Sequence, residues 1–144
     1  MASGNVVVQI LDIMPPATLF APQSVRQGGS TPAERVLIWL FDAATIEYLD
    51  FKCVLNGYAS GGLTFTLPWS AAAATSNVTR WGIGIRRIAD DAEDIDASHT
   101  YDYNDVDDTA ASASGELSYP TIAFADGADM DSWANGEIAI VRVR

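Results

Sequence analysis

Residues 63–88, LTFTLPWSAAAATSNVTRWGIGIRRI, decide the fold class that the sequence predicts. Apolar and polar side chains alternate up to Trp69, and the alternation returns around Trp81. A period of two is typical of a strand with one buried face. The Ala-rich segment between the two runs is too short for more than one or two helical turns. We therefore predict a strand, a short helical crossover at residues 71–75 and a second strand, with a Trp on the core face of each.

Similar patterns recur along the chain, and no long amphipathic helical pattern interrupts them. Eight segments are alternating or rich in β-branched residues: 5–13, 36–41, 46–55, 63–69, 79–88, 100–103, 116–125 and 137–144. We therefore expect an all-β chain that forms a single β-sandwich, jelly-roll-like, with about eight short strands. The continuous apolar run at 36–41 is expected to be covered on both faces. Besides the crossover, helix is expected only as a turn at 130–134.

The tryptophans are the expected anchors of the core, because each large aromatic side chain can bury roughly 150–250 Å². Trp39, Trp69 and Trp81 lie within predicted strands, so we expect all three to be buried. Trp133 lies in a polar loop, so we expect it to be more exposed.

The chain divides into an N-terminal strand with a Pro/Gly-rich arm, residues 1–35, and a sandwich domain, residues 36–144. Proline and glycine disfavour regular pairing of the arm within a sheet. Leu19, Phe20 and Val25 in the arm are nevertheless apolar, so we expect them to pack on a neighbouring subunit or on an underlying shell. The alternative is an arm that folds back over the edge of its own sheet.

The chain is strongly acidic, with 19 acidic and 8 basic residues among 144 and a formal net charge of −11. This charge argues against nucleic acid or an anionic membrane as a partner, because both require Lys and Arg to neutralise phosphates. The single Cys cannot form an intrachain disulfide. The first residues lack the features of a signal peptide, and no apolar run approaches the ~20 residues of a membrane span, so we expect synthesis in the cytoplasm.

Residues 89–116 contain ten acidic residues and no basic one. Clustered carboxylate oxygens are the ligands that Ca²⁺ prefers, so an irregular structural Ca²⁺ site could form there. The candidate ligands are Asp90, Asp91, Asp94, Asp105, Asp107 and Asp108. The alternative is a solvated acidic face that aids solubility, and we expect no other cofactor.

Side chains that could carry out catalysis are few. The only histidine, His99, stands in the acidic stretch without a nucleophile motif such as G-x-S-x-G. Cys53 lies in the middle of a predicted strand, where a cysteine is usually a small buried apolar group. No phosphate-binding or dinucleotide-binding glycine pattern is present. We therefore expect no enzymatic activity and no catalytic residue.

Several of these segments together resemble a group of small structural proteins of tailed bacteriophages. The matching features are the Phe41-Asp42 turn, the strand ending at Trp69, the Ala-rich crossover to the Trp81 strand, and the final strand from Gly136 that closes in alternating Val and Arg. The likeness spans roughly residues 36–144 and consists of packing motifs. It implies a β-sandwich with a structural role, made in the host cytoplasm and located in the virion.

The resemblance and the arm together favour a self-associating virion protein, either a capsid decoration (cement) protein or a head-fibre subunit. Such a protein would form a homo-oligomer, a trimer or higher, and would bind a capsid or another virion protein. One alternative is a carbohydrate- or receptor-binding tip module of a phage fibre, with exposed aromatic side chains as sugar platforms: Trp133, Tyr101, Tyr103 or Tyr119. Another is a subunit of an extracellular filament built by exchange of N-terminal segments.

Overall fold

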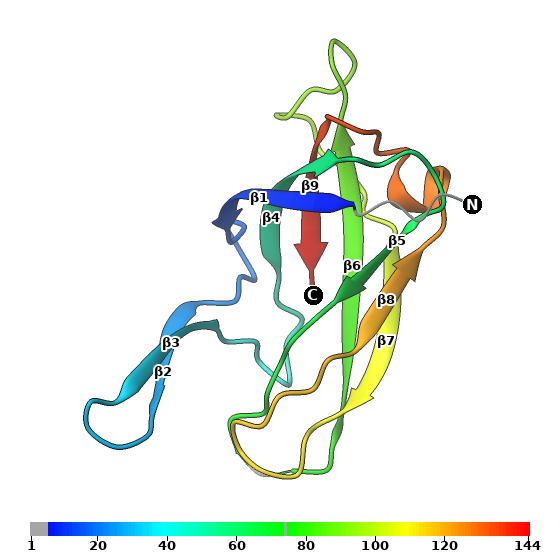
Figure 1. Cartoon of the computed structure of the whole chain (residues 1–144). Coiled ribbons are helices and arrows are strands. Elements are labelled where there is room, and N and C mark those ends of the chain that lie inside the picture. Colours follow the sequence, from blue (N-terminus) through cyan, green and yellow to red (C-terminus); the bar gives the residue numbers. More distant parts are fainter. Residues whose placement is uncertain (1–5, 74) are drawn as a thin grey trace.

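The computed structural model describes residues 6–73 and 75–144, and within them the chain is nearly all β (Figure 1). The strands are β1 (Val7–Met14), β2 (Gln23–Gly28), β3 (Glu34–Trp39), β4 (Leu49–Asn56), β5 (Leu63–Thr66), β6 (Val78–Ile88), β7 (Tyr103–Thr109), β8 (Thr121–Phe124) and β9 (Ile138–Val143). The described helix is a single 3₁₀ turn, η1 (Ala128–Met130).

Five strands form one antiparallel sheet in the order β1-β4-β9-β6-β7. Its central strand β9 pairs with β4 through Phe51↔Val141 and with β6 through Ile85↔Val141. β5 and β8 pair as a second, smaller sheet, and their apolar side chains pack against the inner face of the large one. The two layers form a β-sandwich, so the predicted all-β fold class is confirmed (Figure 1).

Alternation along the strands determines which side chains fill the space between the two layers. In β9, Ala139, Val141 and Val143 are buried, as their period of two predicts. Trp81 on β6 is buried in the same core, and its ring centroid lies 5.5 Å from that of Trp69. Trp69 is half-buried and packs against the core cluster, so these two predicted anchors do meet between the layers.

The outer face of the large sheet carries polar side chains that are paired with one another. Arg142 donates two hydrogen bonds to the Asp50 carboxylate, at 2.6 and 2.7 Å. Its guanidinium also lies 4.4 Å from the centroid of the Tyr101 ring. Gly84 makes room for this arrangement, because a Cβ there would come within 3.1 Å of the Tyr101 side chain. Charge-assisted hydrogen bonds and stacking thus stabilise a half-buried charge on this face.

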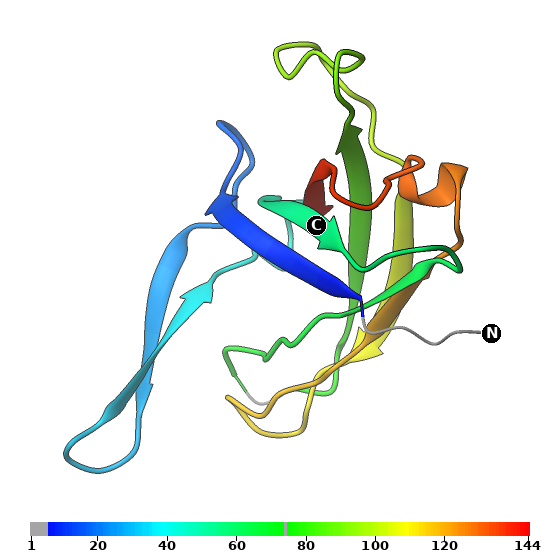
Figure 2. The same cartoon turned by 45° about the horizontal axis from the view of Figure 1, so that its top comes forward.

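The β2–β3 hairpin projects away from the sandwich in both views (Figures 1 and 2). Its register runs from Gln23↔Trp39 to Gly28↔Glu34. Neither strand of the hairpin pairs with a strand of the large sheet or of the β5–β8 sheet. The predicted alternative, an arm that folds back over the edge of its own sheet, therefore holds for only part of the arm. Phe20 forms a parallel bridge with Tyr48 just before β4, and the Ala21 N–H donates to the Tyr48 carbonyl at 3.1 Å, whereas the β2–β3 hairpin that follows stays outside the sheets.

The base of the hairpin is anchored to the sandwich. The Leu40 N–H donates to the Pro22 carbonyl at 2.9 Å, which closes the base with a backbone hydrogen bond. Directly after it, Phe41 lies edge-on to Trp81 with ring centroids 5.2 Å apart. The chain therefore leaves the sandwich and re-enters it at a point fixed by contacts with the core.

Two expectations about the hairpin region are wrong. The run at 36–41 is not covered on both faces, because Val36 and Leu37 are 60% and 59% exposed. Trp39 is half-buried on β3 and lies outside the core cluster, so it is not a core anchor. An apolar run has the same sequence pattern whether its own chain buries it or leaves it exposed, which is why the pattern misled.

Further expectations fail in the loops. Trp133 is 1% exposed, because it packs within the hydrophobic core cluster, where its indole N–H donates to the Glu137 carbonyl at 2.8 Å. The short strand expected at 100–103 is instead β7, which begins at Tyr103 and continues through the acidic segment. No helix is present at residues 71–73 or at Thr75, and residue 74 of the predicted crossover lies outside the described residues, as does Asn5 of the first predicted strand.

Candidate functional site

The β2–β3 hairpin exposes apolar side chains on both of its faces. Val25 and Leu37 are cross-strand neighbours, and Val36 points to the opposite face because successive side chains of a strand alternate. Their exposed fractions are 43%, 59% and 60%. An isolated two-stranded ribbon is at best marginally stable in water, since it buries little apolar surface. The hairpin therefore presents apolar surface that the described part of its own chain leaves uncovered.

The three residues that the sequence singled out for assembly are all exposed. Leu19 and Phe20 lie just before the hairpin, and Val25 lies on β2. The Leu19 backbone adopts a left-handed φ of 52°, and its carbonyl accepts the Tyr48 N–H at 2.8 Å. Contact of these side chains with another subunit stays a prediction. The sequence missed that the more exposed part of the same surface comes from β3.

A second apolar surface lies along β1, an outer strand of the large sheet. One edge of β1 pairs with β4, and no described strand pairs with the other edge. A bulge between Ile10 and Asp12 interrupts the register with β4. An open edge with exposed apolar side chains invites pairing with another chain. The large exposed apolar side chains of β1 are Val7, Ile10, Leu11, Ile13 and Met14.

The basic side chains are unevenly distributed over these surfaces. Arg86 is buried and donates to two backbone carbonyls. Arg26 and Arg35 lie on the hairpin. Within residues 6–73 and 75–144, neither forms an ion pair with a carboxylate. Arg26 donates instead to the Ser114 hydroxyl at 2.7 Å. The remaining basic residues form ion pairs with carboxylates: Lys52, Arg80, Arg87, Arg142 and Arg144.

The acidic residues predicted as Ca²⁺ ligands do not converge. Successive side chains of β7 point to opposite faces, so acidic neighbours in the sequence separate in space. Among the described residues, no group of three or more potential metal ligands comes together, and the predicted Ca²⁺ site is not assembled. Asp90, Asp91 and Asp94 lie in the exposed loop between β6 and β7, while Asp105 pairs with Arg144, Asp107 with Arg80, and Asp108 with the Trp69 indole N–H.

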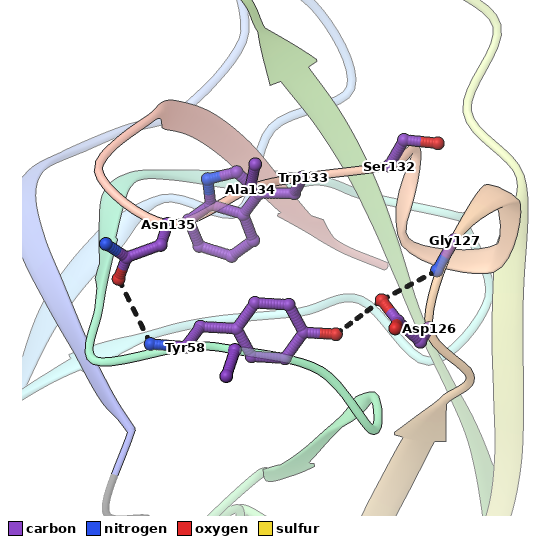
Figure 3. Close-up of a pocket in the computed structure, with 8 residues that line it drawn as sticks. Tyr58, Asp126, Gly127, Ser132, Trp133, Ala134 and Asn135 are labelled. Carbon is purple, nitrogen blue, oxygen red and sulfur yellow. Dashed lines mark hydrogen bonds between the residues drawn. The ribbon is translucent and has the colours of Figure 1, made fainter.

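An open depression of about 420 Å³ lies beside η1, and Figure 3 shows the side chains around it. The Tyr58 hydroxyl donates to the Asp126 carboxylate at 2.6 Å, and the Tyr58 N–H donates to the Asn135 side chain at 3.0 Å (Figure 3). The Gly127 N–H donates to the same carboxylate at 3.0 Å. These polar groups therefore hold the loops together, and the hydrogen bond from Tyr58 lowers the pKa of Asp126. We assign no ligand to this depression.

The aromatic side chains considered as sugar platforms are mostly engaged within the chain. Trp133 is buried, and Tyr101 and Tyr103 stack on the guanidinium groups of Arg142 and Arg144. Burial raises the pKa of Tyr101 to about 12. A sugar platform needs an open aromatic face, which these three side chains do not offer. The fourth, Tyr119, is 58% exposed.

The two side chains considered for catalysis, Cys53 and His99, lie in different parts of the fold. Cys53 is 2% exposed in the core, and burial together with the charge of Asp12 raises the pKa of its thiol to about 11. A thiol of this kind is a poor nucleophile, because the thiolate is the reactive form. His99 lies beside the Tyr101 ring, and its Nε2 is 4.0 Å from the Asp131 carboxylate.

Within residues 6–73 and 75–144, no helix has the length and apolar character needed to span a bilayer. Comparisons of the chain with models of protein families, with curated proteins and with solved structures find no significant match.

Proposed function

We propose that this chain is a non-enzymatic, self-associating structural protein of a virion, used as a capsid decoration (cement) protein or a head-fibre subunit. The observation that carries the proposal is the projecting β2–β3 hairpin, whose apolar side chains are exposed on both faces. A subunit that binds other subunits needs exposed apolar surface for the contact. A domain that acts alone is more stable when the same apolar side chains are buried in its own core.

The free energy available from covering the hairpin is substantial. Full burial of an aliphatic side chain contributes about 1.5–3 kcal/mol. Val25, Val36 and Leu37 are about half exposed, so covering what remains would contribute roughly 2–5 kcal/mol per hairpin. The anchored base supports the same role, because a hairpin that is already positioned loses less conformational entropy when it binds.

The placement in a virion rests on the resemblance to small structural proteins of tailed bacteriophages. The packing motifs behind that resemblance lie together in this fold: Phe41 and Trp69 both contact Trp81 in the core. The acidic surface suits a protein that attaches to other proteins and stays clear of nucleic acid.

The alternatives have less support from the geometry. A receptor-binding tip module would have to rely on Tyr119, since the other three aromatic candidates are engaged within the chain. A filament built by exchange of N-terminal segments would require β1 to leave its own sheet, but β1 pairs with β4 from Val7 to Met14.

The test is removal of the hairpin. Residues 23–39 can be replaced by a short Gly linker, because the Pro22 carbonyl and the Leu40 N–H already lie 2.9 Å apart at its base. Sedimentation equilibrium and binding to expanded phage capsids would be measured for wild type and for the deletion variant. We expect wild type to be oligomeric and to bind the particle, and the variant to be a folded monomer.

A matched control is Val78→Asp, which places a charge at an equally exposed valine outside the hairpin. We expect this variant to assemble like wild type. If the hairpin deletion still oligomerises and still binds particles with unchanged affinity, the hairpin is not the assembly element and the proposal fails.

A further inference from the structure

We propose that the β2–β3 hairpin of one copy packs along the free edge of β1 in a second copy of this chain. The inference rests on the proposed self-association and names the surface that receives the hairpin. In Figure 2, the hairpin and the C-terminal end of β1 lie on the side of the molecule away from β7 and β8, and no described strand pairs with the outer edge of either.

The two outer strands of the large sheet differ in how they are protected. β7 carries acidic side chains, and its neighbour β8 lies close: the Asn104 side chain donates to the Ala123 carbonyl at 2.8 Å. Charged side chains and a covering strand are the usual means by which a sheet edge avoids pairing. β1 has neither of these two protections, because Asp12 is its only charged residue and is already paired with Lys52; the bulge between Ile10 and Asp12 interrupts its edge at one point only.

The hairpin and the β1 edge complement each other in chemistry. Both expose aliphatic side chains, and both have a strand edge whose backbone N–H and C=O groups no described strand satisfies. Addition of a strand to such an edge combines main-chain hydrogen bonds with apolar burial. The bulge at Leu11 divides the edge, so we expect backbone pairing over one half of β1 and side-chain packing over the other.

Charge identifies a second copy as the occupant. The hairpin contains two arginines and one glutamate, a net charge of +1, in a chain whose net charge is −11. Arg26 and Arg35 lack carboxylate partners among the described residues, while β1 contains an acidic residue and no basic one. Asp12 on β1 is itself paired with Lys52, so the attraction comes from the whole second copy, whose net charge of −11 draws the positively charged hairpin.

A complementation experiment tests this pairing. One variant, Val36→Asp/Leu37→Asp, has a hairpin that cannot bind and an intact β1. The other, Ile10→Asp/Met14→Asp, has an intact hairpin and a β1 edge that cannot receive it. All four side chains are more than half exposed, so each variant is expected to fold, which circular dichroism checks. We expect each variant alone to be monomeric and an equimolar mixture to form a one-to-one heterodimer in sedimentation velocity.

Other outcomes overturn the inference in distinguishable ways. If the β1 variant alone still self-associates, hairpins pair with each other or with another surface. If the hairpin variant alone still self-associates, the β1 edges or other surfaces form the contact. In both cases the proposed self-association survives and only this pairing fails. A wild-type chain that is monomeric at every concentration refutes the proposed function itself.

Disulfide trapping gives a second measurement that does not depend on charged substitutions. A tagged Val36→Cys chain and an untagged Ile10→Cys chain would be mixed and oxidised, with Val78→Cys replacing Val36→Cys as the control of equal exposure. The native Cys53 is buried and does not compete. We expect a crosslink between the two different chains for Val36→Cys at least fivefold above the control. Equal yields would refute the pairing.

Discussion

The two buried tryptophans of the core allow a matched test of how this fold is held together. Trp81 and Trp133 are 7% and 1% exposed. The Trp133 indole N–H donates to the Glu137 carbonyl at 2.8 Å, whereas the Trp81 indole N–H has no acceptor among the described residues. Substitution by Phe removes the same atoms at both positions, but it removes a hydrogen bond only at Trp133.

The magnitude follows from this difference. Replacing the indole by a phenyl ring leaves a cavity of similar size at either site. The free-energy cost of this cavity therefore largely cancels when the two variants are compared. Trp133→Phe leaves the Glu137 carbonyl without its donor, which costs about 1–3 kcal/mol, while Trp81→Phe removes a buried donor that was already unsatisfied. We therefore expect Trp133→Phe to be less stable than Trp81→Phe by about 2 kcal/mol.

Urea unfolding at equilibrium is the assay. The free energy of unfolding falls by about 2 kcal/mol per molar urea, so a stability difference of about 2 kcal/mol places the unfolding midpoints of the two Phe variants about 1 M apart. We expect the same urea dependence for both variants. Trp81→Ala is the reference for full truncation and should lose about 3–5 kcal/mol, because the contacts with Phe41 and Trp69 go as well. If Trp81→Phe proves as destabilising as Trp133→Phe, the hydrogen-bond reasoning is wrong.

Three further outcomes can be measured on the purified protein. Because burial raises the pKa of the Cys53 thiol to about 11, we expect a thiol reagent at pH 8 to label the native chain at least tenfold more slowly than the urea-unfolded chain; equal rates would place this thiol outside the core. Because no three or more potential metal ligands come together among the described residues, we expect neither EDTA nor millimolar Ca²⁺ to shift the Tm; a Ca²⁺-dependent rise that EDTA reverses would restore the calcium hypothesis. The hydrogen bonds from Arg87 lower the pKa of Glu137 from its usual 4.5. The ionised carboxylate therefore stabilises the folded state above pH 4.5. This stabilisation is lost as the pH falls through the lowered pKa of the folded state. We expect the Tm of wild type to fall below pH 4.5 and that of Glu137→Gln to fall less steeply, and identical acid profiles would contradict this role.

Local alternation was enough to predict the core face of the strands that carry Trp69 and Trp81. Trp81 in β6 is buried, and the half-buried Trp69 packs against it. In the final strand, alternation separated the two faces but did not say which is inward; the structure buries Ala139, Val141 and Val143 and turns Arg142 to the other face. The separation into two faces follows from the sequence because the period of a strand is fixed by backbone geometry, whatever the rest of the chain does.

The candidate site was predictable only in part. Pro and Gly around Leu19, Phe20 and Val25 indicated a segment outside the sandwich, and these side chains are indeed exposed. The continuous apolar run that contains Val36 and Leu37 predicts a strand covered on both faces, yet both side chains are exposed, because hydrophobicity alone does not say which surface will cover a strand.

Non-local contacts decided the rest. The sequence by itself determined the all-β class and the inward face of the two Trp-bearing strands, since both depend on neighbours along the chain. Only the tertiary structure decided that Trp133 joins the hydrophobic core, that Asp105 and Asp107 each pair with an arginine distant in the sequence, and that β1 is left at an open edge. Each of these outcomes depends on which residues far apart in the sequence meet, and strand order is set by the summed packing of the whole chain.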